Sequence, residues 1–253
     1  MPTRGHTRIV MWEGACLWLA EADRGFDQAG WHAHHALQLT FLLRGKLEMR
    51  TEAEVLSASA IAVNADLRHS LAARGAAAVL FLEPESRAGE FLRSRLFRER
   101  DFVTMDPARV ASQLDALRMA LDAGAARDSL VVLGKALLAA LEGQSARDAE
   151  IDARILKVVE AVASQLDGRM SIEDVGRGIN LSASRLRHLF AEETGLPFKT
   201  YVLWRRMMKA LELMAEGASA TEAAHGAGFS DSAHFARTFK RTFGMSSTTL
   251  KVV

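Results

Sequence analysis

Apolar residues come in short runs between residue 8 and about residue 83, and polar or glycine-containing breaks separate the runs. One run covers 37–43 and ends before Gly45, and positions 46–50 then alternate between polar and apolar. Two further apolar runs cover 55–63 and 77–82. Alternation with a period of two is typical of strands, so this region is predicted to hold many short strands. Such a succession favours a small antiparallel barrel or sandwich.

The apolar period changes to that of helices after about Glu90. One predicted helix begins near Pro107 and ends near Gly124, and another covers 130–141. Each has an apolar face that must be buried, either against the strands or against a second subunit. The small, polar segment 143–148 that follows is the best candidate for a linker.

From about residue 150 onward the pattern is helical throughout. Ser171, Ser182 and Ser219 each stand where a helix is expected to begin, and Ser219 with Glu222 forms the capping-box pattern. A long helix is predicted from Pro197 to Gly217, and the last strong helix from about 231 to 241.

Two phrases in this region repeat each other. Leu186, Phe190 and Gly195 recur 49 positions later as Phe235, Phe239 and Gly244. In both phrases the apolar positions share one helix face, and Arg or His stands on the other. A helix with donors on its outer face fits the major groove of DNA, where Arg is the commonest reader of guanine. The repeat therefore predicts two helix-turn-helix units joined by a helix of ~18 residues, or about 27 Å.

The segment from about Glu150 to Leu250 resembles the DNA-binding domain of AraC/XylS-type transcription regulators. The resemblance is carried by these phrases: Leu181-Ser182, Leu189-Phe190, Glu193-Thr-Gly195, Phe198 to Tyr201, Ala223-Ala224, Gly228-Phe229-Ser230, His234-Phe235, Arg237 to Arg241, and Phe243-Gly244. One departure is Ser246-Ser247, where the family usually has Ser-Pro.

This resemblance implies a role for eight residues of the chain. It implies base contacts by residues on the outer faces of both recognition helices: Ser184, Arg187, His188, Ser232, Ala233 and Arg237. It implies phosphate contacts by Arg205 and Lys240. Because Ala233 offers only a methyl group, the second unit is expected to read few bases.

A histidine cluster marks the N-terminal region. In the run Trp31-His-Ala-His-His35, alternate strand positions place His32 and His34 on one side and His35 on the other. His69, from a neighbouring strand, would complete a three-nitrogen set suited to zinc, nickel or iron. The sequence therefore indicates a candidate metal site at His32, His34 and His69.

The same run resembles the first motif of cupin barrels, which commonly precede this type of DNA-binding domain. That motif has His-x-His, then a Glu, then a Gly, and this chain has Gln38 and Gly45 in the last two positions. Since Gln is a weak neutral ligand, an alternative stays open: a pocket that binds a small organic effector. The effector-site residues are then these: Trp31, His32, His34, Gln38 and His69.

Composition bounds the class of protein but not its function. The 253 residues are 49% apolar and 25% charged, with a net charge of only +1, as in ordinary globular proteins. The charge is local: residues 182–209 hold six Lys/Arg against two Asp/Glu. The single cysteine, Cys16, allows no internal disulfide. The sequence contains no run of 18 apolar residues, so it predicts no membrane-spanning segment. These features fit a cytoplasmic protein.

The expected fold class is α+β, with a cupin-like antiparallel barrel and following helices, then an all-α domain with two helix-turn-helix units. The expected divisions are 1–88 for the barrel, 89–145 for a helical coupling or dimerisation segment, and 150–253 for the DNA-binding domain. The expected function is a sequence-specific, effector-responsive transcription regulator, not an enzyme. Its expected partners are promoter DNA, a small-molecule or metal effector, a second copy of the chain, and RNA polymerase if it activates.

Three other classes of protein fit the sequence less well. A cupin metal-dependent oxygenase or isomerase fused to a helical domain would need a full ligand set, and Gln38 in the acidic position argues against it. A DNA-repair methyl acceptor would need a cysteine cluster, which Cys16 alone excludes. An adaptor protein would leave the doubled helical motif unexplained.

Overall fold

The computed structural model describes residues 6–12, 14–143, 152–166, 171–194 and 196–247. The chain forms two compact units. We call residues 1–148 with 239–253 the N-terminal unit, and residues 149–238 the C-terminal unit, and describe each by itself. The predicted linker, from residue 144 on, lies outside the described residues.

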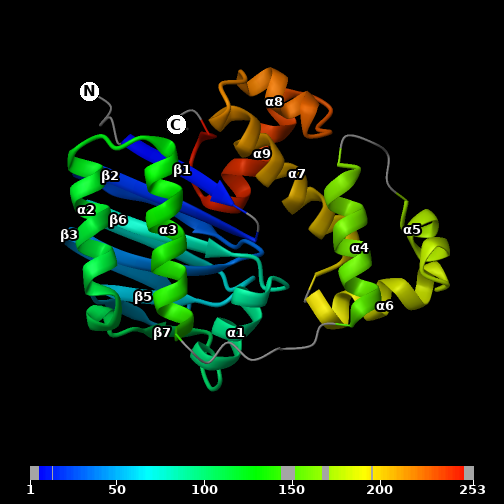
Figure 1. The fold of residues 1–253 in the computed structure, drawn as a ribbon, viewed down its shortest axis with the longest axis horizontal. Coiled ribbons are helices and arrows are strands. Elements are labelled where there is room, and N and C mark those ends of the chain that lie inside the picture. The colour runs from blue at the N-terminus through cyan, green and yellow to red at the C-terminus, as the bar shows by residue number, and fades with distance from the viewer. Residues whose placement is uncertain (1–5, 13, 144–151, 167–170, 195, 248–253) are drawn as a thin grey trace. The chain divides into compact units, whose positions relative to one another are not determined.

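The N-terminal unit is built on one antiparallel sheet (Figure 1). Its strands pair in the order β1-β2-β6-β3-β5-β7, with β4 paired to β3. The strands have these bounds: β1 His6–Trp12, β2 Ala15–His32, β3 Leu37–Thr51, β4 Val55–Ser57, β5 Ala60–Val63, β6 His69–Leu82 and β7 Phe102–Thr104. The predicted antiparallel β-domain is thereby confirmed.

The prediction of many short strands was wrong, because three long strands form most of the sheet. β2, β3 and β6 contain 18, 15 and 14 residues. Gly45 of β3 pairs with Gly75 of β6, and both have a φ of 98°. A Cβ at Gly45 would lie 1.9 Å from the Arg74 carbonyl oxygen. Glycine at both positions lets the two backbones approach this closely while they stay paired, so a residue that suggests a strand end lies inside a long strand instead.

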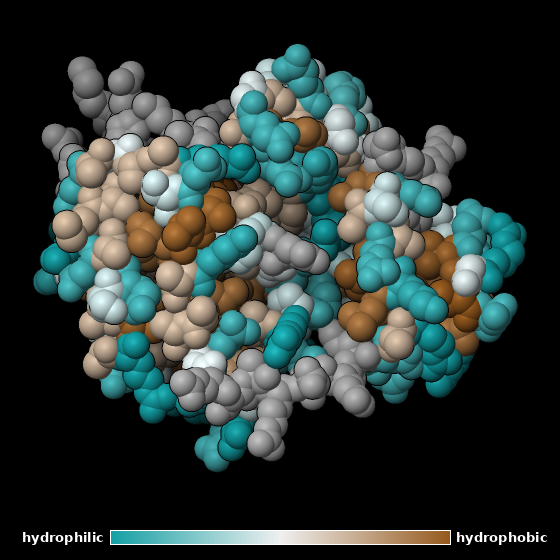
Figure 2. Space-filling model, viewed as in Figure 1, coloured by the Kyte–Doolittle hydropathy of each residue, from teal (hydrophilic) through white to brown (hydrophobic). Residues whose placement is uncertain are grey.

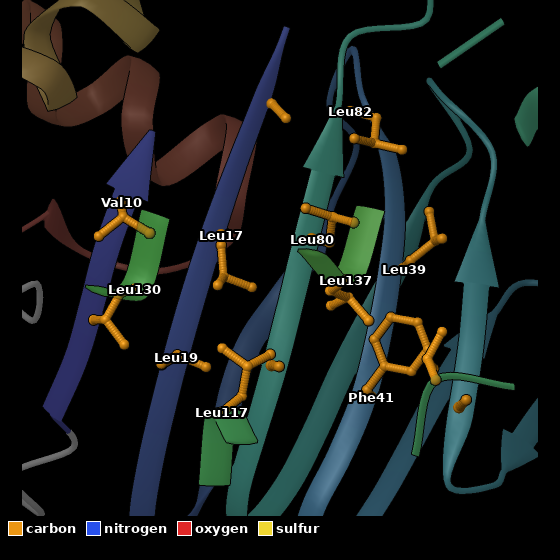
Figure 3. Packing of buried hydrophobic residues seen from close by; sticks show 14 of the residues in the cluster. Val10, Leu17, Leu19, Leu39, Phe41, Leu80, Leu82, Leu117, Leu130 and Leu137 are labelled. Atoms are coloured by element: carbon orange, nitrogen blue, oxygen red, sulfur yellow. The ribbon is translucent and has the colours of Figure 1, made fainter. Parts of the chain in front are cut away.

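Two helices cover one face of this sheet. α2 (Ala111–Asp122) and α3 (Arg127–Glu142) lie across it, as Figure 1 shows. Leu117 of α2 and Leu130 and Leu137 of α3 point at a layer of strand side chains that includes Leu17 and Leu80 (Figure 3). The apolar faces of both predicted helices are therefore buried against strands of their own chain.

Alternation along the strands sends other side chains to the opposite face of the sheet. In β2, Leu17 and Leu19 belong to the core under the helices, whereas Cys16 and Trp18 between them face the other way. Cys16 is buried, as its apolar neighbours suggest. Two short elements complete the unit: α1 (Arg87–Leu96) and a 3-10 turn at Pro107–Val110.

The C-terminal unit is helical. Its helices have these bounds: α4 Ala153–Ser164, α5 Ile172–Gly178, α6 Ala183–Thr194, α7 Phe198–Ala215, α8 Ala220–Gly226 and α9 Ser232–Phe243, the last residues of α9 being grouped with the N-terminal unit. A buried cluster holds α4 to α7 together, with Phe190 and Tyr201 among its largest members. The Phe190 ring centre lies 5.4 Å from that of Phe198 and 5.2 Å from that of Tyr201.

Helix caps agree with the sequence. The Ser171 hydroxyl accepts from the Asp174 N–H at 3.1 Å, and the Ser182 hydroxyl accepts from the Arg185 N–H at 3.2 Å. Ser219 and Glu222 form the full reciprocal capping box. These bonds satisfy N–H groups that a helix start leaves without partners.

On the face that Figure 2 shows, polar and apolar side chains are interspersed, and apolar residues gather over the helices that cover the sheet. Two of the most exposed large apolar residues, Met119 of α2 and Val132 of α3, belong to those helices. None of the described helices combines the length and the apolar character needed to cross a membrane.

Candidate DNA-reading surface and histidine pocket

The helix α6 has two chemically distinct faces. Its buried face packs into the core of the C-terminal unit through Leu186, Leu189 and Phe190. Its other face exposes these predicted base contacts: Ser184, Arg187 and His188. The structure thus brings the three polar residues together on one exposed surface, supported from behind by an apolar core.

The turn before α6 allows α5 to support it closely. Asn180 takes a φ of 56°, in the left-handed region that Asn tolerates, and the Leu181 N–H donates to the Gly176 carbonyl at 2.9 Å. A Cβ at Gly176 would lie 2.6 Å from the Leu181 carbonyl oxygen. Glycine at this position therefore permits the close contact between α5 and the turn.

Arg187 has a partner that the sequence did not reveal. Its Nη2 donates to Oε1 of Glu173, on α5, at 2.7 Å. Both side chains are more than half exposed, at 55% and 56%. An exposed pair of this kind contributes only about 0–1 kcal/mol to folding stability.

The helix α9 repeats the arrangement in its described residues. Phe235 and Phe239 are buried, while Ala233, Arg237 and Lys240 are exposed and Ser232 is half-buried. The Asp231 carboxylate caps the helix by accepting from the His234 N–H at 2.6 Å. The predicted contacts of this unit therefore also lie on the polar side of their helix.

The basic patch predicted along α7 is partly used within the protein. Arg206 donates from Nε to the Leu166 carbonyl at 3.0 Å, and Lys209 pairs with Glu212 at 2.9 Å. Arg205 is half-buried, and its Nη1 lies 3.4 Å from the Tyr201 hydroxyl. The role of Arg206 was missed because Leu166 lies 40 positions away in the sequence.

The second site, which we call the histidine pocket, is a cluster of three buried side chains on the N-terminal unit: His32, His34 and His69. Each offers one ring nitrogen, and these atoms all lie within 4.8 Å of one another. The ring of His32 lies 4.3 Å from that of His69, and the ring of His34 lies 5.1 Å from it. The three histidines that the sequence singled out are therefore brought together.

Backbone carbonyls orient two of the three rings. The Nδ1 of His32 lies 2.7 Å from the Gly30 carbonyl oxygen, and the Nδ1 of His69 lies 2.8 Å from that of Leu67. Burial lowers the pKa of both rings, and for His69 the charges of the neighbouring histidines lower it further. A neutral ring that donates from Nδ1 keeps a lone pair on Nε2, which is the form that binds metal.

Gln38 lies between the rings of His34 and His69. Its Oε1 lies 2.8 Å from Nε2 of His34 and 3.2 Å from Nε2 of His69. Its amide nitrogen donates to Thr40 Oγ1 at 3.0 Å. If His69 is neutral and donates from Nδ1, two acceptors face each other at 3.2 Å, and a proton or a cation between them would relieve this contact, as would a turn of the amide that brings its nitrogen to the ring.

His34 has one nitrogen without a partner. Burial, followed by the charge of His32, lowers its pKa to about 4. Its Nδ1 is buried and makes no hydrogen bond within the described part of the chain. A buried nitrogen without a hydrogen bond is costly, so this ring is held in place at some expense of stability.

His35 points away from this pocket, as the strand alternation predicts. Its Nε2 lies 3.0 Å from Glu85 and its Nδ1 3.3 Å from Asp66. Burial alone would lower its pKa, but the hydrogen bonds and charges of the two carboxylates raise it to about 9. His35 is therefore a buried cation, and its partners were missed because they lie 31 and 50 positions away.

Trp31 lies apart from the three histidines. It is 46% exposed, and the guanidinium of Arg68 lies over its ring at 5.4 Å. Since adjacent strand residues face opposite sides, its neighbour His32 enters the pocket while Trp31 stays at the surface.

A known protein family matches the helical region at the C-terminal end of the chain. Residues 175–251 match the family model described as a helix-turn-helix domain. Residues 175–251 form an AraC-type helix-turn-helix domain. This match includes α6 and α9, the two helices whose polar faces are described above.

Two curated relatives of the AraC-type domain are named as regulators. The Msm operon regulatory protein of Streptococcus mutans is 34% identical over 95 residues, which cover 37% of this chain and 34% of that protein. The transcriptional activator RhrA of Rhizobium meliloti is 34% identical over 88 residues, covering 34% of this chain and 28% of that protein. The chain thus matches about a third of the length of these relatives.

Solved structures share the fold over nearly the whole chain. The apo form of a ToxT point variant from Vibrio cholerae has a TM-score of 0.60 at 12% identity and covers 94% of this chain and 97% of its own. A structure of wild-type ToxT with bound unsaturated fatty acid has a TM-score of 0.54 at 12% identity, covering 93% and 95%. At this identity, the likeness shows that an N-terminal sheet domain and a C-terminal helical domain are shared.

Proposed function

We propose that this protein is a sequence-specific transcription regulator that binds promoter DNA through α6 and α9. One observation carries the proposal: Ser184, Arg187 and His188 share an exposed face over a buried apolar core. Donors placed in this way can reach base edges in the major groove. Arg205 and Lys240 then contact phosphates, as the resemblance implies. The curated relatives are named as regulators, which supports a regulator rather than an enzyme.

The test begins with a preferred DNA sequence selected by the full-length protein from random duplexes. Arg187→Ala should then cost roughly 1–3 kcal/mol of binding free energy on that sequence and relax the preference at one base pair. Arg185→Ala is the matched control, because Arg185 is exposed on the same helix but outside the predicted contact set. An equal loss on every sequence would show that Arg187 contacts only phosphate. Failure to select any sequence would refute the proposed function.

We further propose that the histidine pocket binds the effector, and that a divalent transition metal is part of it. Neutral imidazoles with an amide oxygen beside them suit zinc, nickel or iron(II). The close approach of Gln38 Oε1 to the ring nitrogen of His69 supports this proposal, because a cation bound between the two atoms would satisfy both of them. The metal would supply a Lewis-acid centre to which an effector can bind.

Elemental analysis of the purified protein tests the metal. The wild-type protein should hold about one equivalent of zinc, nickel or iron, and the double variant His32→Ala/His34→Ala should hold none. The matched control His188→Ala/His234→Ala changes two histidines outside the pocket and should keep the metal. If the wild-type protein takes up none of the three metals even when they are added, the pocket binds an organic effector or only packs.

An effector regulates DNA binding only if it favours one arrangement of the protein over another. We therefore expect the affinity for the selected DNA to change when the pocket is filled. A homodimer, contact with RNA polymerase if the protein activates, and a cytoplasmic location complete the proposal. The exposed Met119 and Val132 give such a dimer an apolar surface on α2 and α3.

A further inference from the structure

One difference between the two helix-turn-helix units involves a pair of positions on neighbouring helices. Ser171 and Ser219 cap their first helices, and the third residue after each cap, Asp174 or Glu222, is the acid bonded to it. The first unit carries a second acid, Glu173, immediately before that residue. The second unit has Thr221 there. Glu173 therefore takes no part in the capping hydrogen bonds, although its charge also suits the first turn of a helix.

The partner of Glu173 differs between the two units as well. In the spacing that aligns Leu186 with Phe235, Arg187 corresponds to Ala236. The second unit thus has neither the acid at this position of its first helix nor an arginine at the position of Arg187, and the arginine of its second helix stands one position later, at Arg237. In the first unit, by contrast, Glu173 Oε1 and Arg187 Nη2 lie 2.7 Å apart. At these two aligned positions, the first unit has both the acid and the arginine, and the second unit has neither.

We propose that Glu173 positions Arg187 for its base pair and thereby sets the sequence preference of the first recognition helix. The proposal rests on the proposed function, in which Arg187 reads a base. A guanidinium has five N–H donors in a planar fork, so the bond to Glu173 leaves others free for the O6 and N7 atoms of a guanine. Holding the fork in place before binding removes part of the entropy cost of ordering a long side chain.

The carboxylate also opposes the wrong contacts. A negative charge beside Arg187 disfavours close approach of a phosphate, so it weakens the sequence-independent attraction of this arginine to the DNA backbone. Glu173 is then a positioning residue that favours the correct base and disfavours non-specific binding. If Glu173 acted only through its negative charge, it would weaken binding to all DNA sequences alike. A change in base preference therefore distinguishes positioning of Arg187 from a general charge effect.

The experiment measures binding of the full-length protein to its selected duplex, to single base-pair substitutions of that duplex, and to a scrambled duplex. Glu173→Gln and Glu173→Ala should each weaken binding to the selected duplex by about three- to tenfold, from the entropy of one freed side chain. Binding to the scrambled duplex should stay equal or become tighter. Preference should relax at the same base pair that Arg187→Ala relaxes, and Glu173→Gln should add nothing further to Arg187→Ala.

Glu192→Gln is the matched control, because it removes the same charge from an exposed position on α6 itself. It should change binding to all duplexes by one common factor. If Glu173→Gln behaves in the same way, with base preference unchanged, Glu173 does not position Arg187 and the inference fails. That result leaves the proposed function intact as long as Arg187→Ala still relaxes one base pair. If Arg187→Ala relaxes the preference at no base pair, the proposal that Arg187 reads a base is wrong instead.

Discussion

The histidine pocket and the outer face of α6 both gather polar side chains, but they draw on the chain differently. The pocket takes His32 and His34 from the end of β2 and the residues after it, Gln38 from β3 and His69 from β6. The face of α6 takes all its predicted contacts from one helix. In the pocket, burial lowers the pKa of each histidine, so the surroundings decide the chemistry. On α6 the residue types themselves decide the chemistry, and the surrounding residues only support the helix.

This contrast predicts that the face of α6 depends most strongly on the core beneath it. Phe190→Ala removes a fully buried ring that contacts Phe198 and Tyr201, and should destabilise the C-terminal unit by about 3–5 kcal/mol. Chemical denaturation followed by circular dichroism measures the change. Ser184→Ala, on the exposed face of the same helix, should change stability by less than about 0.5 kcal/mol. Similar losses of stability in the two variants would contradict the prediction, because the exposed face of α6 would then contribute to stability as much as the core does.

The second prediction concerns the buried charge beside the pocket. Because the pKa of His35 is raised to about 9, its contribution to stability is complete below pH ~6.5 and is lost as the pH rises through 9. The loss should be on the order of 3 kcal/mol. Since the pKa of His34 is lowered to about 4, stability should also fall as the pH drops below ~6.5. The N-terminal unit should therefore be most stable near pH ~6.5.

Thermal melts of the protein in a metal chelator, from about pH 5 to about pH 9.5, test this optimum. His35→Gln should lose stability at pH ~6.5 and no longer show the alkaline decline. His188→Gln, which changes an exposed histidine on α6, should keep the wild-type pH profile. An alkaline decline that persists unchanged in His35→Gln would assign it to other groups.

The same contrast explains which features the sequence could predict. Helix caps, amphipathic faces and the doubled motif depend on residues a few positions apart, so Ser219, Leu186 and Phe235 could be assigned directly. The continuation of β3 through Gly45 could not, because it depends on Gly75 across the ladder. Where glycine pairs with glycine, a local turn signal and the interior of a long strand look alike.

Long-range polar partners were missed for a related reason. The sequence showed that His35 points away from the pocket, but Glu85 lies 50 positions later and only the fold brings it near. Arg206 and Leu166 are separated by 40 positions in the same way. Charged residues counted as a patch in the sequence can therefore already have partners within the protein.

A third prediction sharpens the role of Gln38. Gln38→Glu would place a carboxylate oxygen between His34 and His69, and a charged oxygen is a stronger ligand for a divalent metal than an amide oxygen. Metal affinity, measured by competition with a chelator, should rise by about tenfold or more. Gln113→Glu adds the same charge on α2, and should leave the affinity unchanged. An unchanged affinity in Gln38→Glu would place Gln38 outside the metal site.

The smallest expected effect concerns Arg205, which differs from Arg187 in being half-buried and close to the Tyr201 hydroxyl. As a phosphate contact, it should contribute equally to every DNA sequence. Arg205→Ala should therefore weaken binding to the selected and the scrambled duplex by the same factor, and reduce the slope of log K against log salt by about 0.9. Lys135→Ala on α3 removes a positive charge from the N-terminal unit and should leave the slope unchanged. A loss confined to the selected duplex would show that Arg205 reads sequence, and an unchanged slope would exclude a phosphate contact.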